Sequence, residues 1–205
     1  RKAEELILAG RIKVNGQVAA ELGTRVDPAT DKVYVEGRPV KPPVKKIYIK
    51  LNKPIGFFSS CVSQKGERTV LDLVNNIPGR LYPVGRLDVN SEGLMILTND
   101  GELANRLMHP RYEHEKEYVV NVQLTINNEQ LRSLSSGIIL DGKRTLPAKV
   151  KKISEKSFSI VLREGKKRQN RRMVEAVGNR VVRLKRVRIN DIQLGNLAVG
   201  EFRRL

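Results

Sequence analysis

One segment of the chain, residues 83–100, constrains the fold more than any other. Gly85 predicts a turn, and the apolar run at 94–97, which polar residues bound on both sides, predicts a buried strand. The turn delivers Asp88 just before that strand, where an acid is held as rigidly as a reacting carboxylate must be. An alternative stays open at this point, in which Asp88 only pairs with Arg86 or caps the turn.

The charge of the chain indicates the class of its partner. The 205 residues include 39 Lys and Arg against 22 Asp and Glu, so the formal net charge is +17. This excess is larger than solubility requires and predicts a polyanionic partner such as RNA. No basic amphipathic helix with a bulky apolar face is predicted, so we expect no membrane partner.

Cysteine and histidine are scarce. The chain has one cysteine, Cys61, and two histidines, His109 and His114. A disulfide within the chain is therefore excluded, and a Cys/His metal cluster is not expected. No secretory signal or membrane span is predicted either. We expect a cytoplasmic protein that binds no metal and acts as a monomer.

Residues 1–41 predict a small RNA-binding module. Its predicted elements, in chain order, are a helix at 1–10, a strand at 12–14, a tight turn at 15–16 and a strand at 33–35. The run at 9–16 resembles the helix-to-strand signature of the alpha-L RNA-binding motif. The first helix of that motif would precede Arg1, so we interpret residues 1–41 as a partial domain of this type.

A Pro- and Lys-rich linker at 42–46 is predicted to lead into a larger domain at 47–205. Alternation of apolar residues, or short apolar runs, predict strands at 47–52, 94–97, 116–124, 148–150 and 158–162. Apolar spacing and capping residues predict helices at 69–75, 100–107 and 128–135. Strands joined by short turns, with helices interspersed irregularly, favour an α+β fold with a mixed, largely antiparallel sheet.

The segment 163–188 is the most basic part of the chain, with eleven basic residues against two acidic ones. It predicts a helix that follows Gly165, runs to Val177 and ends at Gly178. The basic residues expected to crowd one face of this helix are Lys167, Arg168, Arg171 and Arg172. So many like charges need a nearby anion, either RNA phosphates or a protein carboxylate. A basic face exposed only to solvent is the alternative.

Tyr118 shares one face of its predicted strand with Val120, Val122 and Leu124. It therefore points with apolar residues, toward the core or a cleft. A tyrosine that only fills the core is the alternative.

Four motifs in chain order resemble ribosomal RNA pseudouridine synthases of the RsuA/RluB type. They lie at 85–88 (Gly-Arg-Leu-Asp), 101–110, 116–118 (Lys-Glu-Tyr) and 164–178. The resemblance covers essentially the whole chain. It implies the pseudouridine synthase catalytic fold and the conversion of a specific uridine in ribosomal RNA to pseudouridine, without metal or organic cofactor.

The resemblance also implies roles for particular residues. It makes Asp88 the covalent catalyst, Tyr118 the ring that packs on the target base, and Arg171 the cation that pairs with Asp88. Arg86 would help to hold the flipped-out site. Further basic residues expected to bind the RNA are Lys167, Arg168, Arg172, Arg183 and Lys185.

The chemistry of the reaction fits these roles. The enzyme must break the bond from nitrogen to the ribose carbon and remake it to carbon 5 of the same ring. The detached uracil must rotate without escaping, so we expect a closed, apolar pocket around one buried carboxylate. Burial alone would neutralise that nucleophile, and a partner such as Arg171 keeps Asp88 ionised. The carboxylate has two candidate points of attack, the base and the ribose.

The chain departs from the family pattern at three positions. Asn170 stands where an aliphatic residue is usual, Phe202 where tryptophan is usual, and Arg168 where the small-subunit branch often has histidine. Arg168 and the motif at 101–110 favour an enzyme that acts on large-subunit rRNA. A synthase for small-subunit rRNA, a non-catalytic ribosome-assembly factor that binds RNA, and a general nucleic-acid binder remain alternatives.

Overall fold

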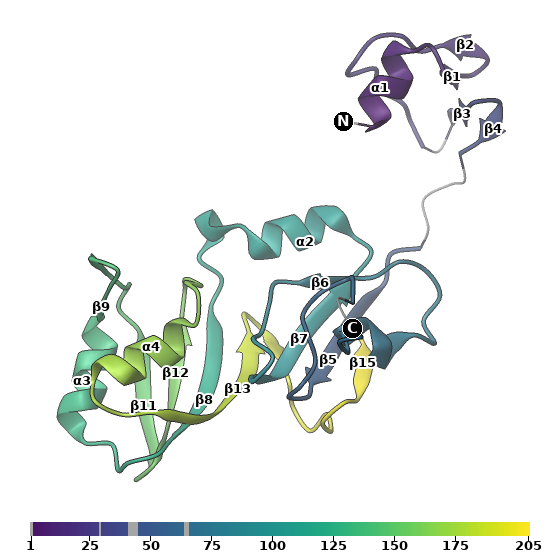
Figure 1. Cartoon of the computed structure of the whole chain (residues 1–205). Helices are drawn as coiled ribbons and strands as arrows, with labels where there is room; N and C mark the ends of the chain where they lie inside the picture. The colour runs from purple at the N-terminus through teal and green to yellow at the C-terminus, as the bar shows by residue number, and fades with distance from the viewer. Residues whose placement is uncertain (1, 29, 41–44, 64–65) are drawn as a thin grey trace. The chain divides into compact units, whose positions relative to one another are not determined.

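The computed structural model describes residues 2–28, 30–40, 45–63 and 66–205. The chain divides into two compact units, Arg1–Lys45 and Lys46–Leu205 (Figure 1). The predicted linker at 42–46 falls mainly on positions 42–44, outside the described residues.

The N-terminal unit combines one short helix with a small sheet. Its elements are α1 (Lys2–Leu8), β1 (Ile12–Val14), β2 (Gln17–Val18), β3 (Val33–Val35) and β4 (Arg38–Pro39). The strands pair antiparallel in the order β2-β1-β3-β4. Asn15 and Gly16 both have positive φ, 50° and 86°, as a tight two-residue hairpin turn requires. The predicted helix, turn and strands are confirmed.

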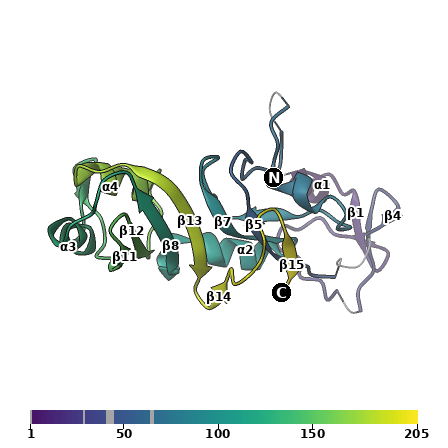
Figure 2. The same ribbon diagram turned by 90° about the horizontal axis from the view of Figure 1, so that it is seen from below.

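A long sheet forms the frame of the larger unit. Its strands are β5 (Tyr48–Lys53), β6 (Tyr82–Val84), β7 (Glu92–Thr98), β8 (Lys116–Val122), β11 (Lys149–Ser154), β12 (Ser157–Leu162), β13 (Val181–Ile189), β14 (Ile192–Gln193) and β15 (Phe202–Arg204). The central order is β11-β12-β8-β13-β7-β5-β15, while β6 pairs with β7 and β14 with β13. Among the strand pairs of the described residues, β7–β13 alone is parallel, which confirms the mixed, largely antiparallel α+β fold. Figure 2 shows β13 between β8 and β7.

Short helices and one further hairpin complete this unit. They are the 3-10 helices η1 (Val70–Val74) and η2 (Pro110–Tyr112), the α-helices α2 (Gly101–Met108), α3 (Asn128–Ser136) and α4 (Gln169–Ala176), and the hairpin of β9 (Ile139–Leu140) with β10 (Lys143–Arg144). The Asp100 carboxylate accepts the N–H of Leu103 at 3.2 Å and so caps α2, the helix predicted at 100–107. The N-cap of α3 is Asn127, and Gly137 follows its last turn.

The central strand β7 is buried along its whole length, which confirms the strand predicted at 94–97. Met95 and Leu97 belong to the main apolar core, whereas Leu94 and Ile96 belong to a second cluster. Because alternate residues of a strand face opposite sides, both faces of the sheet are covered here. The loop that precedes β7 is therefore attached to a strand that is buried on both faces.

Gly93 lets β7 and β13 approach each other closely. A side-chain carbon at this position would lie 2.2 Å from the carbonyl oxygen of Arg186, and the φ of Gly93 is +106°. Only glycine meets both conditions without moving backbone. The parallel pairing of β7 with β13 sets Gly93 opposite Arg186.

Candidate active site

A cleft of about 560 Å³ opens beside the middle of the sheet. Its walls come from the loop between β6 and β7, the end of α2, strands β8, β12 and β13, and the start of α4. The predicted site residues that line it are Arg86, Asp88, Tyr118 and Arg168. Residues far apart in the sequence therefore meet in one concave surface.

The side chain of Asp88 is directed into the cleft by its neighbour. Leu87 is buried in the core, so the residues on either side of it, Arg86 and Asp88, are exposed and face the opening. The Ser59 hydroxyl fixes this arrangement, because it donates to the Leu87 carbonyl at 2.7 Å and accepts the Leu87 N–H at 3.0 Å.

Lys53 holds the loop between β6 and β7 through hydrogen bonds to its backbone. Its ammonium group is fully buried and donates to the carbonyls of Pro54, Asp88 and Ser91 at 2.9, 3.2 and 2.7 Å. Burial lowers the pKa of Lys53 to about 8, and the Asp88 carboxylate partly opposes that shift. The sequence had suggested only a strand end here, since nothing in the Lys-Pro pair indicates which carbonyls the lysine meets.

The contacts of Arg171 differ from the direct ion pair with Asp88 that the resemblance implies. Its guanidinium donates to the carbonyls of Asn90 and Val181 at 2.9 and 3.4 Å, and among the described residues it has no carboxylate within 4 Å. Asp88 is exposed rather than buried, because Leu87 takes the inward position. Burial and the Arg168 charge lower the pKa of Arg171, and Asp88 raises it. Arg171 therefore holds the end of the Asp88 loop and acts on the carboxylate through its field.

Tyr118 and Arg186 form adjacent parts of the cleft wall. They lie directly opposite each other on β8 and β13. Tyr118 is 9% exposed, packed into the core and also open to the cleft, so neither the core nor the cleft interpretation alone describes it. Leu124, predicted to share its face, is exposed, because β8 ends at Val122.

The predicted basic helix begins later than the sequence suggested. α4 starts at Gln169, and Arg168 before it has φ 52°, so Lys167 and Arg168 lie in the preceding turn and do not crowd a helix face with Arg171. Arg172 pairs with Asp141, and Arg183 with Glu92. The predicted RNA-binding residues that do not line the cleft are Lys167, Arg172, Arg183 and Lys185.

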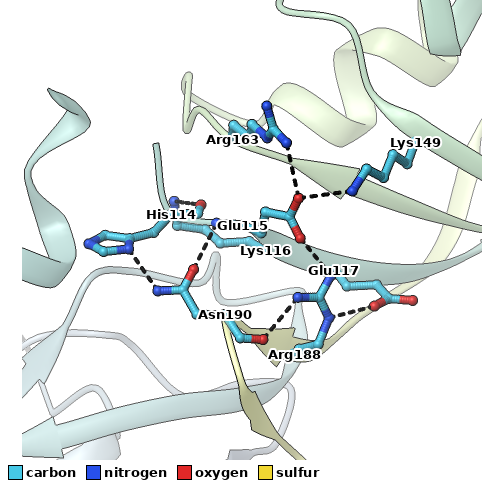
Figure 3. Close-up of polar contacts among 8 residues, drawn as sticks. All are labelled: His114, Glu115, Lys116, Glu117, Lys149, Arg163, Arg188 and Asn190. Atoms are coloured by element: carbon cyan, nitrogen blue, oxygen red, sulfur yellow. Dashed lines mark hydrogen bonds and ion pairs between the residues drawn. The ribbon is translucent and has the colours of Figure 1, made fainter. Parts of the chain in front are cut away.

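An ion-pair network supports the cleft from the side of β8 (Figure 3). The Glu115 carboxylate receives Lys149, Arg163 and Arg188 at 3.2, 3.4 and 3.1 Å. Arg188 also meets Glu117 at 2.8 Å. The Lys149 hydrogen bond, followed by that of Arg188, lowers the pKa of Glu115. Lys116 and Tyr118, at the alternate positions of β8, line the cleft.

His114 connects this network to α2. Its Nδ1 lies 2.7 Å from Nδ2 of Asn190 and its Nε2 lies 3.0 Å from the Arg106 carbonyl. Because Oδ1 of Asn190 accepts the Glu115 N–H, the Asn190 nitrogen must face the imidazole (Figure 3). These bonds place the imidazole proton on Nε2 and give His114 a structural role.

Comparison with known proteins agrees with this geometry. A family model described as RNA pseudouridylate synthase matches residues 47–176, and an S4 domain model matches residues 1–31. The ribosomal large subunit pseudouridine synthase B of Bacillus subtilis is 46% identical over all of this chain and 86% of its own length. An uncharacterized RNA pseudouridine synthase of Aquifex aeolicus is 44% identical over all of this chain and 84% of its own length. A crystal structure of a pseudouridylate synthase superposes with a TM-score of 0.74 at 31% identity, over the whole chain and 89% of the other.

The chain belongs to the RNA pseudouridine synthase family. The resemblance seen in the four motifs is thereby confirmed, and the chain is an isomerase that converts uridine to pseudouridine in RNA. This assignment favours an enzyme over a non-catalytic RNA-binding factor. The S4 match agrees with the RNA-binding module predicted at the N-terminus.

Several polar groups in the pseudouridine synthase cleft were not predicted from the sequence. Three buried side chains that line it each have one polar atom without a hydrogen-bond partner in the described part of the chain: Oγ of Ser91, Oδ1 of Asn170 and Nη2 of Arg186. Such atoms are rare in folded proteins, because burial without a partner is costly. Spacing and composition carry no signal for them, since partners depend on tertiary packing.

The described residues contain neither a candidate metal centre nor a membrane-spanning helix. None of their His, Cys, Asp and Glu side chains gather in a group of three or more that could hold a metal ion. None of the helices in that part of the chain is long and apolar enough to cross a membrane.

Proposed function

We propose that this enzyme converts a uridine of large-subunit ribosomal RNA to pseudouridine, with Asp88 as the nucleophile. The main support is the position of Asp88, whose exposed carboxylate lies in the same cleft as Tyr118 on a loop pinned by Ser59 and Lys53. A nucleophile must be both accessible and held still, and this loop provides both conditions.

The target base must leave its stack before the carboxylate can reach it, which costs a few kcal/mol. Tyr118 offers a ring for the extruded base to pack against, and Arg86 and Arg168 offer cationic groups for the flanking phosphates. Arg171 holds the end of the Asp88 loop through the Asn90 carbonyl, and Arg186 adds a cationic group to the wall of the cleft. The reaction then breaks the bond between ribose C1′ and N1 and forms the bond between C1′ and C5, and the C5 hydrogen is released.

Basic residues outside the cleft extend the proposed RNA surface. They are Lys167, Arg172, Arg183 and Lys185. Each phosphate contact would steepen the dependence of RNA affinity on salt by about 0.7 to 0.9 log units per log of salt concentration. Contacts of this kind bind RNA without regard to sequence, so they position the substrate and leave selection of the uridine to the cleft and the RNA shape.

Large-subunit rRNA is the favoured substrate because the Bacillus subtilis relative, matched over the whole chain, carries that activity in its name. Another relative, from Salmonella typhi, is 40% identical and is named as a dual-specificity RNA pseudouridine synthase, so one fold serves more than one RNA target. We further propose that the enzyme acts as a monomer in the cytoplasm.

Mapping pseudouridines in ribosomal RNA tests this proposal. RNA from cells that lack the protein is compared with RNA from the parent strain and from the strain complemented with the wild-type chain. We expect one or a few large-subunit positions to lose pseudouridine and to regain it on complementation. Loss confined to small-subunit rRNA would overturn the substrate assignment, and no loss in either rRNA would overturn the function.

A further inference from the structure

Asn170 is a buried amide whose side chain makes no hydrogen bond with the part of the chain that the structure describes. It is the second residue of α4, is 7% exposed and lines the cleft. Its Oδ1 is closed off from solvent and has no hydrogen-bond partner in residues 2–28, 30–40, 45–63 and 66–205. The residue lies between Gln169 and Arg171, so it stands at the same helix end that holds the Asp88 loop.

The neighbouring amide, that of Gln169, has a structural role. Gln169 is equally buried, but its Oε1 accepts the Lys166 N–H at 3.0 Å and its Nε2 donates to Glu164 at 2.7 Å. Gln169 thereby fixes the turn before α4. Asn170 fixes nothing, and a leucine of nearly the same size would fill its space without burying an unpaired amide.

The chemistry of the substrate supplies the missing partner. One edge of uracil presents the O4 acceptor, the N3–H donor and the O2 acceptor in a row, and an amide side chain carries one acceptor beside one donor. Since no group in the described part of the chain holds the amide of Asn170, the side chain can turn until its oxygen and its nitrogen both face the cleft.

We propose that the Asn170 amide hydrogen-bonds the N3–H and an adjacent carbonyl of the flipped uracil and holds the base during isomerisation. This proposal rests on the assignment of the cleft as the uridine site.

The symmetry of the uracil ring explains why this contact suits the reaction. When the detached ring turns by half a revolution about the axis through N3 and C6, N1 and C5 exchange places, and so do O2 and O4. The N3–H stays on the axis, and a carbonyl oxygen returns to the position that the other one left. An amide bonded at N3–H and one carbonyl therefore finds the same pattern before and after the turn, while C5 is brought to the ribose carbon.

The test compares Asn170→Leu with wild type in tritium release from large-subunit rRNA transcribed with C5-tritiated uridine. Most RNA affinity comes from phosphate contacts, and the base contact forms only after flipping, so the loss should fall on kcat. We expect kcat to fall at least tenfold, KM for the transcript to change by less than threefold, and the melting temperature to be equal to or above that of wild type. Asn170→Ala, which cannot clash with the cleft wall, serves as the second variant.

Gln169→Leu is the matched control, because the groups on Glu164 and Lys166 would lose their partner, so its melting temperature should fall. A folded Asn170→Leu or Asn170→Ala enzyme with kcat within twofold of wild type would overturn the proposal, and so would a loss confined to KM. Failure of the cleft assignment itself would show differently, as activity that survives Asp88→Asn.

Discussion

Two groups of polar side chains in the larger unit, one around Glu115 and one in the cleft, are built in opposite ways. In the network around Glu115, each carboxylate meets at least one cation and Arg188 meets two carboxylates. In the cleft, Asn170 and Arg186 are more deeply buried, and yet each has a polar atom that finds no partner among the described residues. The better shielded groups are therefore the less satisfied ones.

This difference separates structure from function. A satisfied network holds strands together, and it gains nothing from a ligand. An unsatisfied buried group costs folding free energy, about 1 to 3 kcal/mol for a typical case, and such groups persist where a substrate completes their bonds. The comparison predicts that changes in the network lower stability, and that changes in the cleft lower turnover and leave stability unchanged or improved.

The largest expected effect comes from Gly93, which lies opposite Arg186 where β7 pairs with β13. Gly93→Ala forces a side-chain carbon against the Arg186 carbonyl at a φ of +106°. Backbone on both β7 and β13 has to move, so we expect a loss of about 3 kcal/mol or more in the free energy of unfolding. Urea denaturation measures this loss. Gly101→Ala is the control, since nothing lies within 4 Å of the added carbon and its φ is not positive. A stable Gly93→Ala protein would contradict the close approach of the two strands.

Two arginines on β13 provide the sharpest matched pair. Arg188→Met removes the partner of Glu115 and Glu117, and we expect it to cost about 2 kcal/mol of stability. Arg186→Met removes a buried cation that has no carboxylate partner in the described chain and whose Nε donates to the Leu94 carbonyl at 2.7 Å, so stability should change by about 1 kcal/mol or less. Its turnover should fall about tenfold, which corresponds to about 1.4 kcal/mol. Thermal unfolding measures the stability of both variants, and tritium release measures their turnover. Equal losses of stability and of turnover in the two variants would contradict the comparison.

A smaller effect is expected from Glu115→Gln, about 1 kcal/mol at neutral pH and low salt. Because its neighbours lower the pKa of Glu115, the stability that its charge contributes is present above the ordinary pKa of 4.5 and disappears as the pH falls below that value. The difference between wild type and variant should therefore shrink from pH 7 to pH 3. A difference independent of pH would show that the carboxylate charge is not what stabilises this network.

Sequence patterns predicted most of the fold and the neighbourhood of the site. The buried strand β7, the helix α2 and the α+β sheet follow from local periodicity and capping residues, which a sequence shows directly. The late start of α4 was missed, because the left-handed conformation of Arg168 is fixed by the Gln169 contacts around it. The family resemblance implied a direct pair between Arg171 and Asp88, whereas two backbone carbonyls accept the hydrogen bonds of the guanidinium in the fold.

The central claim is that Asp88 is the nucleophile of a uridine isomerase. The most direct measurement is tritium release from C5-tritiated large-subunit rRNA by Asp88→Asn, alongside its affinity for the same RNA. The amide keeps the size of the side chain and the loop contacts, which are made by the backbone carbonyl of Asp88, but it cannot act as a nucleophile. We predict that release falls by at least about 1,000-fold while RNA affinity stays within about tenfold. Release at more than a tenth of the wild-type rate would contradict the account.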